Sequence, residues 1–156
     1  QIQSASGVGQ GSFYHHFASK ADLAEAALTS LAEEMCDQFD ALTEETGLAV
    51  GEAFLSCPRD ALAGCRIGRI TMEASLTDPR IMDPIARYFV HIRERLTDAF
   101  DVIDIDIEPV ALADLAIATV QGSYVLARAT GDPDAQANAT SALVALIHTA
   151  IGRRRP

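Results

Sequence analysis

The sequence predicts an all-α protein. The chain has 156 residues, of which 49% are hydrophobic and 22% charged, and these ordinary globular values exclude wholesale disorder. Alanine is abundant and tryptophan is absent, and apolar residues recur at three- and four-residue spacing, as they do in amphipathic helices. No uninterrupted apolar stretch approaches the ~18 residues of a membrane-spanning helix, so we expect no membrane partner.

The clearest helix is expected from Lys20 to about Leu42. Ser19 has the N-cap position at its start, and Asp22 has the position of a capping-box acid. At 1.5 Å per residue this helix is about 34 Å long, so it can reach from one lobe of the protein to another. Residues three and four apart form its apolar face: Leu23, Ala27, Leu28, Leu31, Met35, Phe39 and Leu42.

Two shorter helices are expected next, at 49–56 and 65–76. Asp78-Pro79 and Asp83-Pro84 both have the cap-then-proline pattern of a helix start. An apolar stripe continues from the second of these to about residue 101 and consists of Ile85, Phe89, Ile92, Leu96 and Phe100.

The remaining chain is expected to form two long helices after a connector. Residues 101–108 alternate isoleucine with acidic residues, but a lone strand has no partner here, so we predict an extended connector. Pro109 opens a helix that runs to about residue 129. Gly131, Asp132 and Pro133 then have the C′, N-cap and N1 positions between that helix and the last one, which is expected to end near residue 151.

The charge distribution separates the beginning of the chain from the rest. With 22 acidic and 12 basic residues, the net charge is −10, which normally argues against a nucleic-acid partner. Residues 1–20, however, carry no acid and a single charge, that of Lys20. This segment is therefore the least repulsive place for a polyanion to bind.

The cysteines and histidines suggest no metal chemistry. Cys36, Cys57 and Cys65 are an odd, sparse set, typical of a reducing cytoplasm without a disulfide framework. Their spacing matches no zinc pattern, so we expect buried thiols. His15 and His16 would point about 100° apart on a helix. We therefore expect no metal site and no cofactor.

The first twenty residues have the pattern of two short helices joined by a tight turn. The first helix is expected to end at Gly7, and the second is expected over 10–16. On the second helix, Phe13 can face inward, while a polar set is left to face outward: Gln10, Ser12, Tyr14 and His15. Lys20 opposes the dipole at a helix start, so it is either simply solvated or placed to hold an anion such as a DNA phosphate.

The segment 5–23, ASGVGQGSFYHHFASKADL, resembles the helix-turn-helix signature of the TetR family of bacterial transcriptional regulators. The resemblance rests on the turn glycine, Gly11-Ser12, Tyr14, His16-Phe17, Ser19-Lys20 and Leu23. More loosely, Gly64 to Arg69 with Asp78-Pro79, and Gln121-Gly122 with the 129–133 stretch, look like later parts of the family.

The sequence departs from the family pattern at three points. The family has a further helix before Ile2, commonly basic, so we expect a truncated DNA-binding lobe. Gly9 stands where the family usually has an N-cap serine, at a small cost. Gln10 occupies a position that is often basic, so DNA binding should depend less steeply on salt.

The resemblance implies two domains and a set of DNA contacts. Residues 1–23 would be a partial helix-turn-helix DNA-binding domain, and residues 24–156 a helical ligand-binding and dimerisation domain. By position, Gln10 and Tyr14 would contact base edges in the major groove. Phosphate contacts would come from Ser12, His15 and Lys20, and backbone contacts from Gln3 and Ser4.

The resemblance also implies a small-molecule effector and a homodimer. Several residues are candidates for the lining of the effector pocket, and the alternative for each is a plain core position. They are Met35, Phe39, Phe54, Met72, Tyr88, Phe89, Ile92, Gln121 and Tyr124. Met, Phe and a few polar tips suit an apolar or aromatic ligand, and no charged residue stands out as an anchor. Small residues in the two C-terminal helices favour a dimer that pairs them with a second copy.

The function predicted from these features is a cytoplasmic, ligand-responsive regulator that binds a double-stranded DNA operator, with repression as the expectation from the family. No G-x-S-x-G, phosphate loop, H-E-x-x-H or dinucleotide motif is present, so no enzyme is predicted. The alternative left open is a helical dimer that binds a ligand or partner without DNA.

Overall fold

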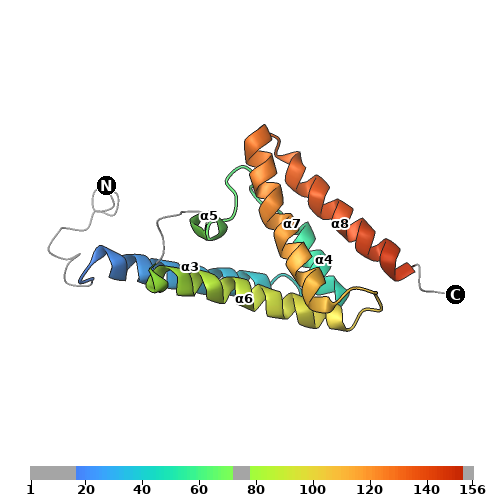
Figure 1. Ribbon diagram of the computed structural model, residues 1–156, viewed down its shortest axis with the longest axis horizontal. Helices are drawn as coiled ribbons and strands as arrows, with labels where there is room; N and C mark the ends of the chain where they lie inside the picture. The colour runs from blue at the N-terminus through green and yellow to red at the C-terminus, as the bar shows by residue number, and fades with distance from the viewer. Residues whose placement is uncertain (1–16, 72–77, 153–156) are drawn as a thin grey trace.

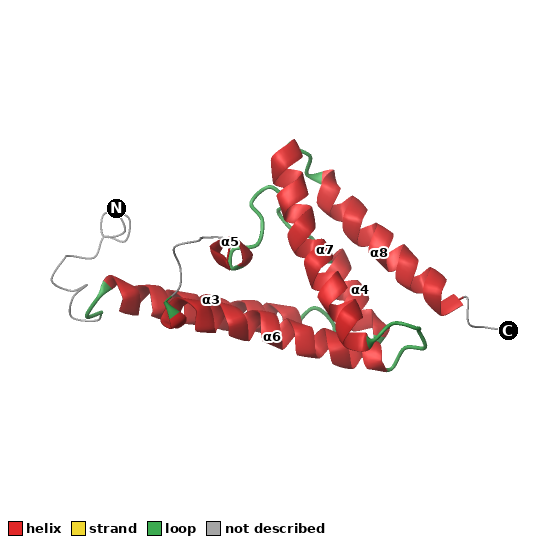
Figure 2. Cartoon of the chain, in the orientation of Figure 1, coloured by secondary structure: helices red, strands yellow, loops and turns green. Residues whose placement is uncertain are grey.

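The computed structural model describes residues 17–71 and 78–152, and within these ranges all regular structure is helical (Figure 2). The helices are α3 (Lys20–Asp40), α4 (Leu48–Ser56), α5 (Gly68–Thr71), α6 (Pro79–Asp101), α7 (Pro109–Thr130) and α8 (Asp134–Gly152). The long helices α3 and α6 pack against each other, α7 packs on α6, and α8 packs on α7 (Figure 1). The predicted all-α class is confirmed.

The long first helix begins where its capping residues predict. The Oγ atom of Ser19 accepts a hydrogen bond from the backbone N–H of Asp22 at 3.1 Å, which satisfies one of the free donors at a helix start. The helix ends at Asp40, within two residues of the expected end. In Figure 1, α3 and α6 form an elongated layer, and α3 reaches away from the other helices toward the N-terminus.

The second short helix differs from the prediction. Helix α4 confirms the expected helix at 49–56, but α5 begins at Gly68 rather than at Cys65. The Cys65 sulfur accepts a hydrogen bond from the backbone N–H of Gly68 at 3.2 Å. Cys65 thus precedes the helix and caps it instead of belonging to it. The expected continuation over 72–76 lies outside the described residues.

Only one of the two predicted aspartate–proline starts begins a helix. The Oδ1 atom of Asp78 accepts from the backbone N–H of Arg80 at 3.0 Å, and Pro79 follows at the first helical position. Asp83-Pro84 lies inside α6, so the second predicted start is wrong. Pro84 gives up one backbone donor, but its side chain is fully buried, and that burial offsets the loss.

Helices α7 and α8 form an antiparallel hairpin. Gly131 ends α7 with φ 71°, a left-handed conformation that glycine adopts without strain. The Oδ1 atom of Asp132 accepts from the backbone N–H of Asp134 at 2.9 Å. These contacts confirm the predicted separation of the two helices, and the connector between α6 and α7 is non-helical, as expected.

The hydrophobic core is centred on α6. Ile92, Leu96 and Phe100 are 0% exposed, and they pack with residues of α3, α4, α7 and α8. Gly51 on α4 makes room for the Phe100 ring, because a Cβ atom there would lie 2.4 Å from Phe100 Cε1. The core therefore fixes α6 between the N-terminal helix and the C-terminal hairpin.

Ion pairs on the surface link α6 to its neighbours. Asp40 of α3 accepts from His91 at 3.1 Å and from Arg95 at 3.2 Å. Arg93 binds Asp114 of α7 with two nitrogens, one of them at 2.9 Å, and this hydrogen bonding lowers the pKa of the Asp114 carboxyl. Exposed pairs add little stability, so the buried core holds these helices together.

Candidate functional site

The predicted DNA contacts lie almost entirely outside the described residues: Gln3, Ser4, Gln10, Ser12, Tyr14 and His15. Lys20 is described, and it is the exposed first residue of α3. The structure thus places one member of the set at the helix start that the sequence predicts. The roles assigned to all seven residues stay predictions.

The first turn of α3 is tied to the first turn of α6. Asp22 accepts from Arg80 Nη1 at 3.3 Å, and Arg80 also donates to Asp78 Oδ2 at 2.8 Å. This hydrogen bonding lowers the pKa of the Asp78 carboxyl. An exposed ion pair therefore joins the start of α6 to the start of α3, close to Lys20.

Two adjoining cavities lie between α7 and the segment that precedes α6. Their volumes are about 340 Å³ and about 370 Å³, each within the range of small-molecule sites. Both are lined by Gln121 and Tyr124 of α7 and by the same stretch of loop, residues 63–65. We call the first the α5 cavity, because Gly68, Arg69 and Thr71 line it, and the second the α3 cavity, because Met35 and Phe39 line it.

One face of α7 forms the wall of the α5 cavity. Gln121, Tyr124, Val125 and Arg128 line it, and their spacing of three, four and seven residues puts them on one side of a helix. The opposite side of α7 packs into the core through Ala116 and other buried residues. Because that core contact fixes the helix, these four side chains are held toward the cavity.

The shared wall carries polar groups without protein partners. Within the described residues, neither the Gln121 amide nor the Tyr124 hydroxyl makes a hydrogen bond to the protein, and the same holds for the Tyr88 hydroxyl, which lines the α3 cavity alone. Burial raises the pKa of Tyr124 to about 12, so this hydroxyl stays protonated at neutral pH. These groups can donate to a ligand, since polar groups in such surroundings otherwise bond to water.

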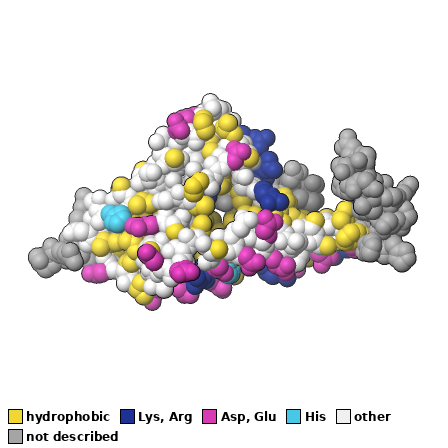
Figure 3. Space-filling view, turned by 180° about the vertical axis from the view of Figure 1, so that it is seen from behind, with side chains coloured by type: hydrophobic (Ala, Val, Ile, Leu, Met, Phe, Trp, Pro, Cys, Tyr) yellow, Lys and Arg dark blue, Asp and Glu magenta, His cyan; other side chains and the backbone are white. Residues whose placement is uncertain are grey.

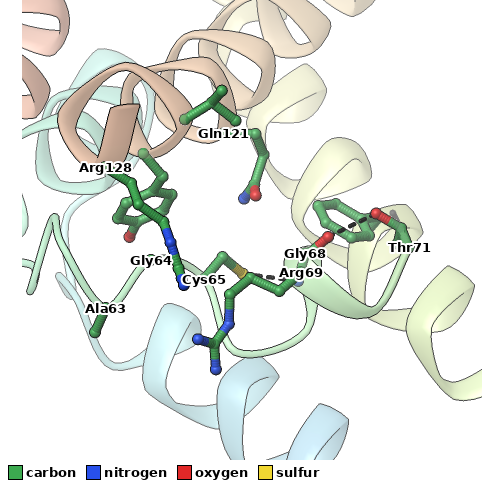
Figure 4. Close-up of a pocket in the computed structure, with 11 residues that line it drawn as sticks. Ala63, Gly64, Cys65, Gly68, Arg69, Thr71, Gln121 and Arg128 are labelled. Carbon is green, nitrogen blue, oxygen red and sulfur yellow. Dashed lines mark hydrogen bonds between the residues drawn. The ribbon is translucent and has the colours of Figure 1, made fainter. Parts of the chain in front are cut away.

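Gly68 sets the position of the Gln121 amide. A Cβ atom on Gly68 would lie 2.3 Å from Gln121 Oε1 and 3.1 Å from Cys65 Cβ. Only a residue without a side chain therefore lets the amide approach α5 this closely. Figure 4 shows Gln121 at one end of the α5 cavity, facing the α5 segment.

The arginines near the cavities have different environments. Arg59 donates to the carbonyls of Cys57 and Phe54 and lies over the Phe54 ring, 5.1 Å from its centroid. Its guanidinium is therefore occupied within the protein. Arg69 and Arg128 both line the α5 cavity and are exposed, and neither makes an ion pair within the described part of the chain.

Most residues predicted to bind a ligand lie at these cavities. The α3 cavity is lined by Met35, Phe39, Phe54 and Tyr88, the α5 cavity by Phe89, and both by Gln121 and Tyr124. Ile92 is 0% exposed and belongs to the core, and Met72 lies outside the described residues. Ligand binding by this set stays a prediction.

The sequence-based prediction saw no charged anchor, yet Arg69 and Arg128 border the α5 cavity. Arg128 lies seven residues after Gln121 on the same helix, so helical spacing from Gln121 was the signal that could have found it. No comparable signal marks Arg69, which is placed by the turn that leads into α5.

The cysteines differ in burial. Cys65 is buried, whereas Cys36 and Cys57 are half-buried, and all three are free thiols. Burial, followed by the nearby Asp40 carboxylate, raises the pKa of the Cys36 thiol. Within residues 17–71 and 78–152, no group of three or more His, Cys, Asp or Glu side chains is placed to hold a metal ion.

Apolar side chains are exposed on the C-terminal hairpin. Leu115 and Leu126 of α7 are 47% and 51% exposed, and Leu146 of α8 is 65% exposed. Leu115, Gly122 and Leu126 share one side of α7, apart from its core and cavity faces. Helix α7 is also long and apolar enough to span a membrane, but this is weak evidence, because helices that pack in cores and interfaces have the same composition.

Comparisons with known proteins give one sequence match at the N-terminus and one match to the fold. Residues 1–27 match the family described as "Bacterial regulatory proteins, tetR family". The fold is similar to that of a TetR transcriptional regulator from Legionella pneumophila, with a TM-score of 0.75, 20% identity, and coverage of 93% of this chain and 83% of that one. No curated protein sequence matches.

The N-terminal match and the shared helical fold define the protein as a DNA-binding transcriptional regulator. More particularly, the N-terminal match is to the TetR family, and the fold of the described chain is similar to that of a TetR transcriptional regulator.

Proposed function

We propose that the protein is a homodimeric repressor that leaves a palindromic DNA operator when a small molecule occupies the cavities between α7 and the α5 segment. The observation that carries this proposal is the pair of adjoining cavities whose common wall presents Gln121 and Tyr124 without protein hydrogen-bond partners. A regulator of this kind works in the cytoplasm, where its DNA lies.

DNA recognition is assigned to the beginning of the chain. Gln10 and Tyr14 contact base edges, with Gln10 suited to bond adenine through both atoms of its amide. Ser12, His15 and Lys20 hold phosphates, and Gln3 and Ser4 add backbone contacts. The exposed position of Lys20 at the start of α3 supports its part of this assignment.

The dimer is assigned to the exposed apolar side of α7 and α8. Leu126 and Leu146 are more than half exposed in the single chain, and covering such side chains with a second copy removes them from water. Two copies of the hairpin form a four-helix arrangement. The dimer also supplies two DNA-reading helices, which must be about one DNA turn, ~34 Å, apart to bind half-sites of a palindrome.

The cavities are connected to the DNA-binding end through α6. The α5 segment precedes α6 in the chain, and Phe89 of α6 lines the α5 cavity. The start of α6 is bound to the start of α3 through Arg80 and Asp22. A ligand that favours a shifted α6 therefore tilts α3 and changes the spacing of the two reading helices, for a typical coupling of ~1–3 kcal/mol.

A mobility-shift titration with the complete coding sequence tests the proposal. We expect specific retardation of the DNA upstream of the protein's own gene, weakened by added salt because phosphate contacts release counterions. Unrelated DNA of equal length is the control. No retardation at low salt would contradict the proposal.

A second candidate function is a helical dimer that binds a ligand or partner without DNA. The net charge of −10 favours it, and Figure 3 shows acidic side chains distributed along the lower helical layer. Since such a surface repels DNA, this candidate predicts no retardation in the same titration.

A further inference from the structure

We propose that the ligand of the α5 cavity is an organic acid, with an anionic head bound by Arg69 and Arg128 and an apolar body that extends toward the α3 cavity. This inference rests on the proposed function only in taking the cavity as the effector site.

The charge of the α5 cavity is opposite to that of the protein. The chain has 22 acidic residues and a net charge of −10, yet none of the described residues that line this cavity is acidic, and two of them are arginines. Two guanidiniums on one cavity, neither paired with an acid of the described residues, repel each other, and an anion between them relieves that repulsion. Figure 3 shows basic side chains gathered along one edge above the acidic helical layer.

Arg69 and Arg128 stand apart from the other arginines of the described ranges. Arg66, Arg80, Arg93 and Arg95 all lie within 4 Å of an acidic side chain. Arg59 is bound to backbone carbonyls, and Arg87 donates to the Thr29 hydroxyl at 3.5 Å. Arg69 and Arg128 have no such partner there. In the view of Figure 4, their side chains come from α5 and α7 and extend toward the end of the cavity away from Gln121.

The chemistry of these two residues selects the head group. A guanidinium presents a planar fork of N–H donors that matches a carboxylate with two parallel hydrogen bonds. An ammonium ligand would meet two like charges, and a neutral alcohol would forgo the charge-assisted bonds. The head group is therefore anionic.

The remainder of the wall selects the body. Phe89 and Val125 line the α5 cavity, and the adjoining α3 cavity is lined by Phe39, Phe54 and Met35. These side chains offer apolar contact to a chain or ring. Gln121 and Tyr124 border both cavities, so they can donate to a polar atom on the body of the ligand. The cavity volumes admit a body of several carbon atoms.

A series of probes with one shared chain separates head from body. Octanoate, 1-octanol and octylammonium carry the same apolar chain with negative, neutral and positive heads, and acetate carries the head alone. Isothermal titration of the full-length dimer should show octanoate binding at least roughly tenfold more tightly than 1-octanol, because two charge-assisted bonds are lost with the neutral head. Octylammonium and acetate should bind more weakly still.

Variants locate the anion. Arg69→Gln and Arg128→Gln should each weaken octanoate binding by roughly tenfold and leave 1-octanol binding unchanged. Arg87→Gln is the matched control, because Arg87 is an exposed arginine of α6 outside both cavities. Circular dichroism confirms that each variant is folded, as expected for exposed side chains.

The outcomes separate this inference from the proposed function. Equal binding of octanoate and 1-octanol, no binding of octanoate, or insensitivity of octanoate to both arginine variants would overturn the organic-acid inference. Tight, arginine-dependent octanoate binding that leaves the DNA complex intact would support the ligand class and contradict effector release. Release of DNA by 1-octanol as readily as by octanoate would support effector release and contradict the organic-acid inference.

Discussion

The contact between Gly51 and Phe100 allows a quantitative prediction for the substitution Gly51→Ala. The added Cβ atom would lie 2.4 Å from Phe100 Cε1 and 2.6 Å from Cζ, whereas non-bonded carbons prefer ~3.5–4.0 Å. The Phe100 ring is 0% exposed, so it cannot swing into solvent. Helix α4 or the ring must therefore move by about an ångström within a packed core.

The expected cost follows from two opposing contributions. Overpacking of a core costs about 1–3 kcal/mol, and alanine in place of glycine favours a helix by up to about 1 kcal/mol. We expect a net loss of about 1–2 kcal/mol, because the overlap exceeds an ångström. For a domain of this size that loss corresponds to a fall in Tm of about 2–8 °C.

Gly68→Ala provides the matched control. Its Cβ atom would overlap just as closely, at 2.3 Å, but with the Oε1 atom of Gln121, the end of a flexible side chain that can rotate away. The next neighbour, Cys65 Cβ at 3.1 Å, needs to shift by only a few tenths of an ångström. The free energy of unfolding should then change by less than about 0.5 kcal/mol. The same glycine-to-alanine change thus has different effects because one neighbour can move and the other cannot.

Thermal and urea unfolding followed by circular dichroism measure both variants, at one protein concentration because dimerisation contributes to apparent stability. Combining Gly51→Ala with Phe100→Leu, which shortens the ring side chain, should cost less than the sum of the two single changes by at least about 0.5 kcal/mol. Gly51→Ala as stable as the parent, or Gly68→Ala destabilised to the same extent, would refute the reasoning.

Three further predictions concern the dimer and the response to pH. Leu146→Asp places an unpaired charge on the proposed interface, so analytical ultracentrifugation should show a dimer Kd raised roughly 100-fold or more; an unchanged Kd would place the interface elsewhere. The raised pKa of Tyr124, about 12, means that its neutral form stabilises the fold fully below pH ~10, and that this contribution is lost as pH rises toward 12. Tyr124→Phe should therefore reduce the loss in the free energy of unfolding that urea titrations measure at alkaline pH. The same variant should lack one late step in the absorbance of tyrosinate. The lowered pKa of Asp114 beside Arg93 means that its contribution is present above pH ~4 and is lost at lower pH, so Asp114→Asn should flatten the dependence of stability on acid pH.

Local signals predicted the helices well where one residue decides a boundary. Ser19 and Asp22 marked the start of α3, and Gly131 marked the end of α7, because capping bonds are made between neighbours in sequence. Asp78 and Asp83 carry the same local signal, and only the first begins a helix. Pro84 lies inside α6 and is fully buried, and the local sequence does not contain that information.

The cavity was predictable in part. Gln121 and Tyr124 were among the candidate pocket linings that the resemblance implied, and the structure brings them to the wall shared by both cavities. Ile92 has the same apolar character as the lining residues, yet it is 0% exposed in the core, because its position depends on the rotation of α6 against four other helices. The approach of Gly68 to Gln121 likewise joins residues distant in sequence.

The central claim is that the polar face at the start of the chain binds duplex DNA, and Tyr14→Ala tests it most directly. Fluorescence anisotropy with the complete dimer and its own upstream DNA should show loss of specific binding by Tyr14→Ala, while ultracentrifugation shows the dimer intact. Tyr124→Phe, which alters a tyrosine at the cavities, should bind that DNA like the parent. DNA binding by Tyr14→Ala with unchanged affinity would contradict the account.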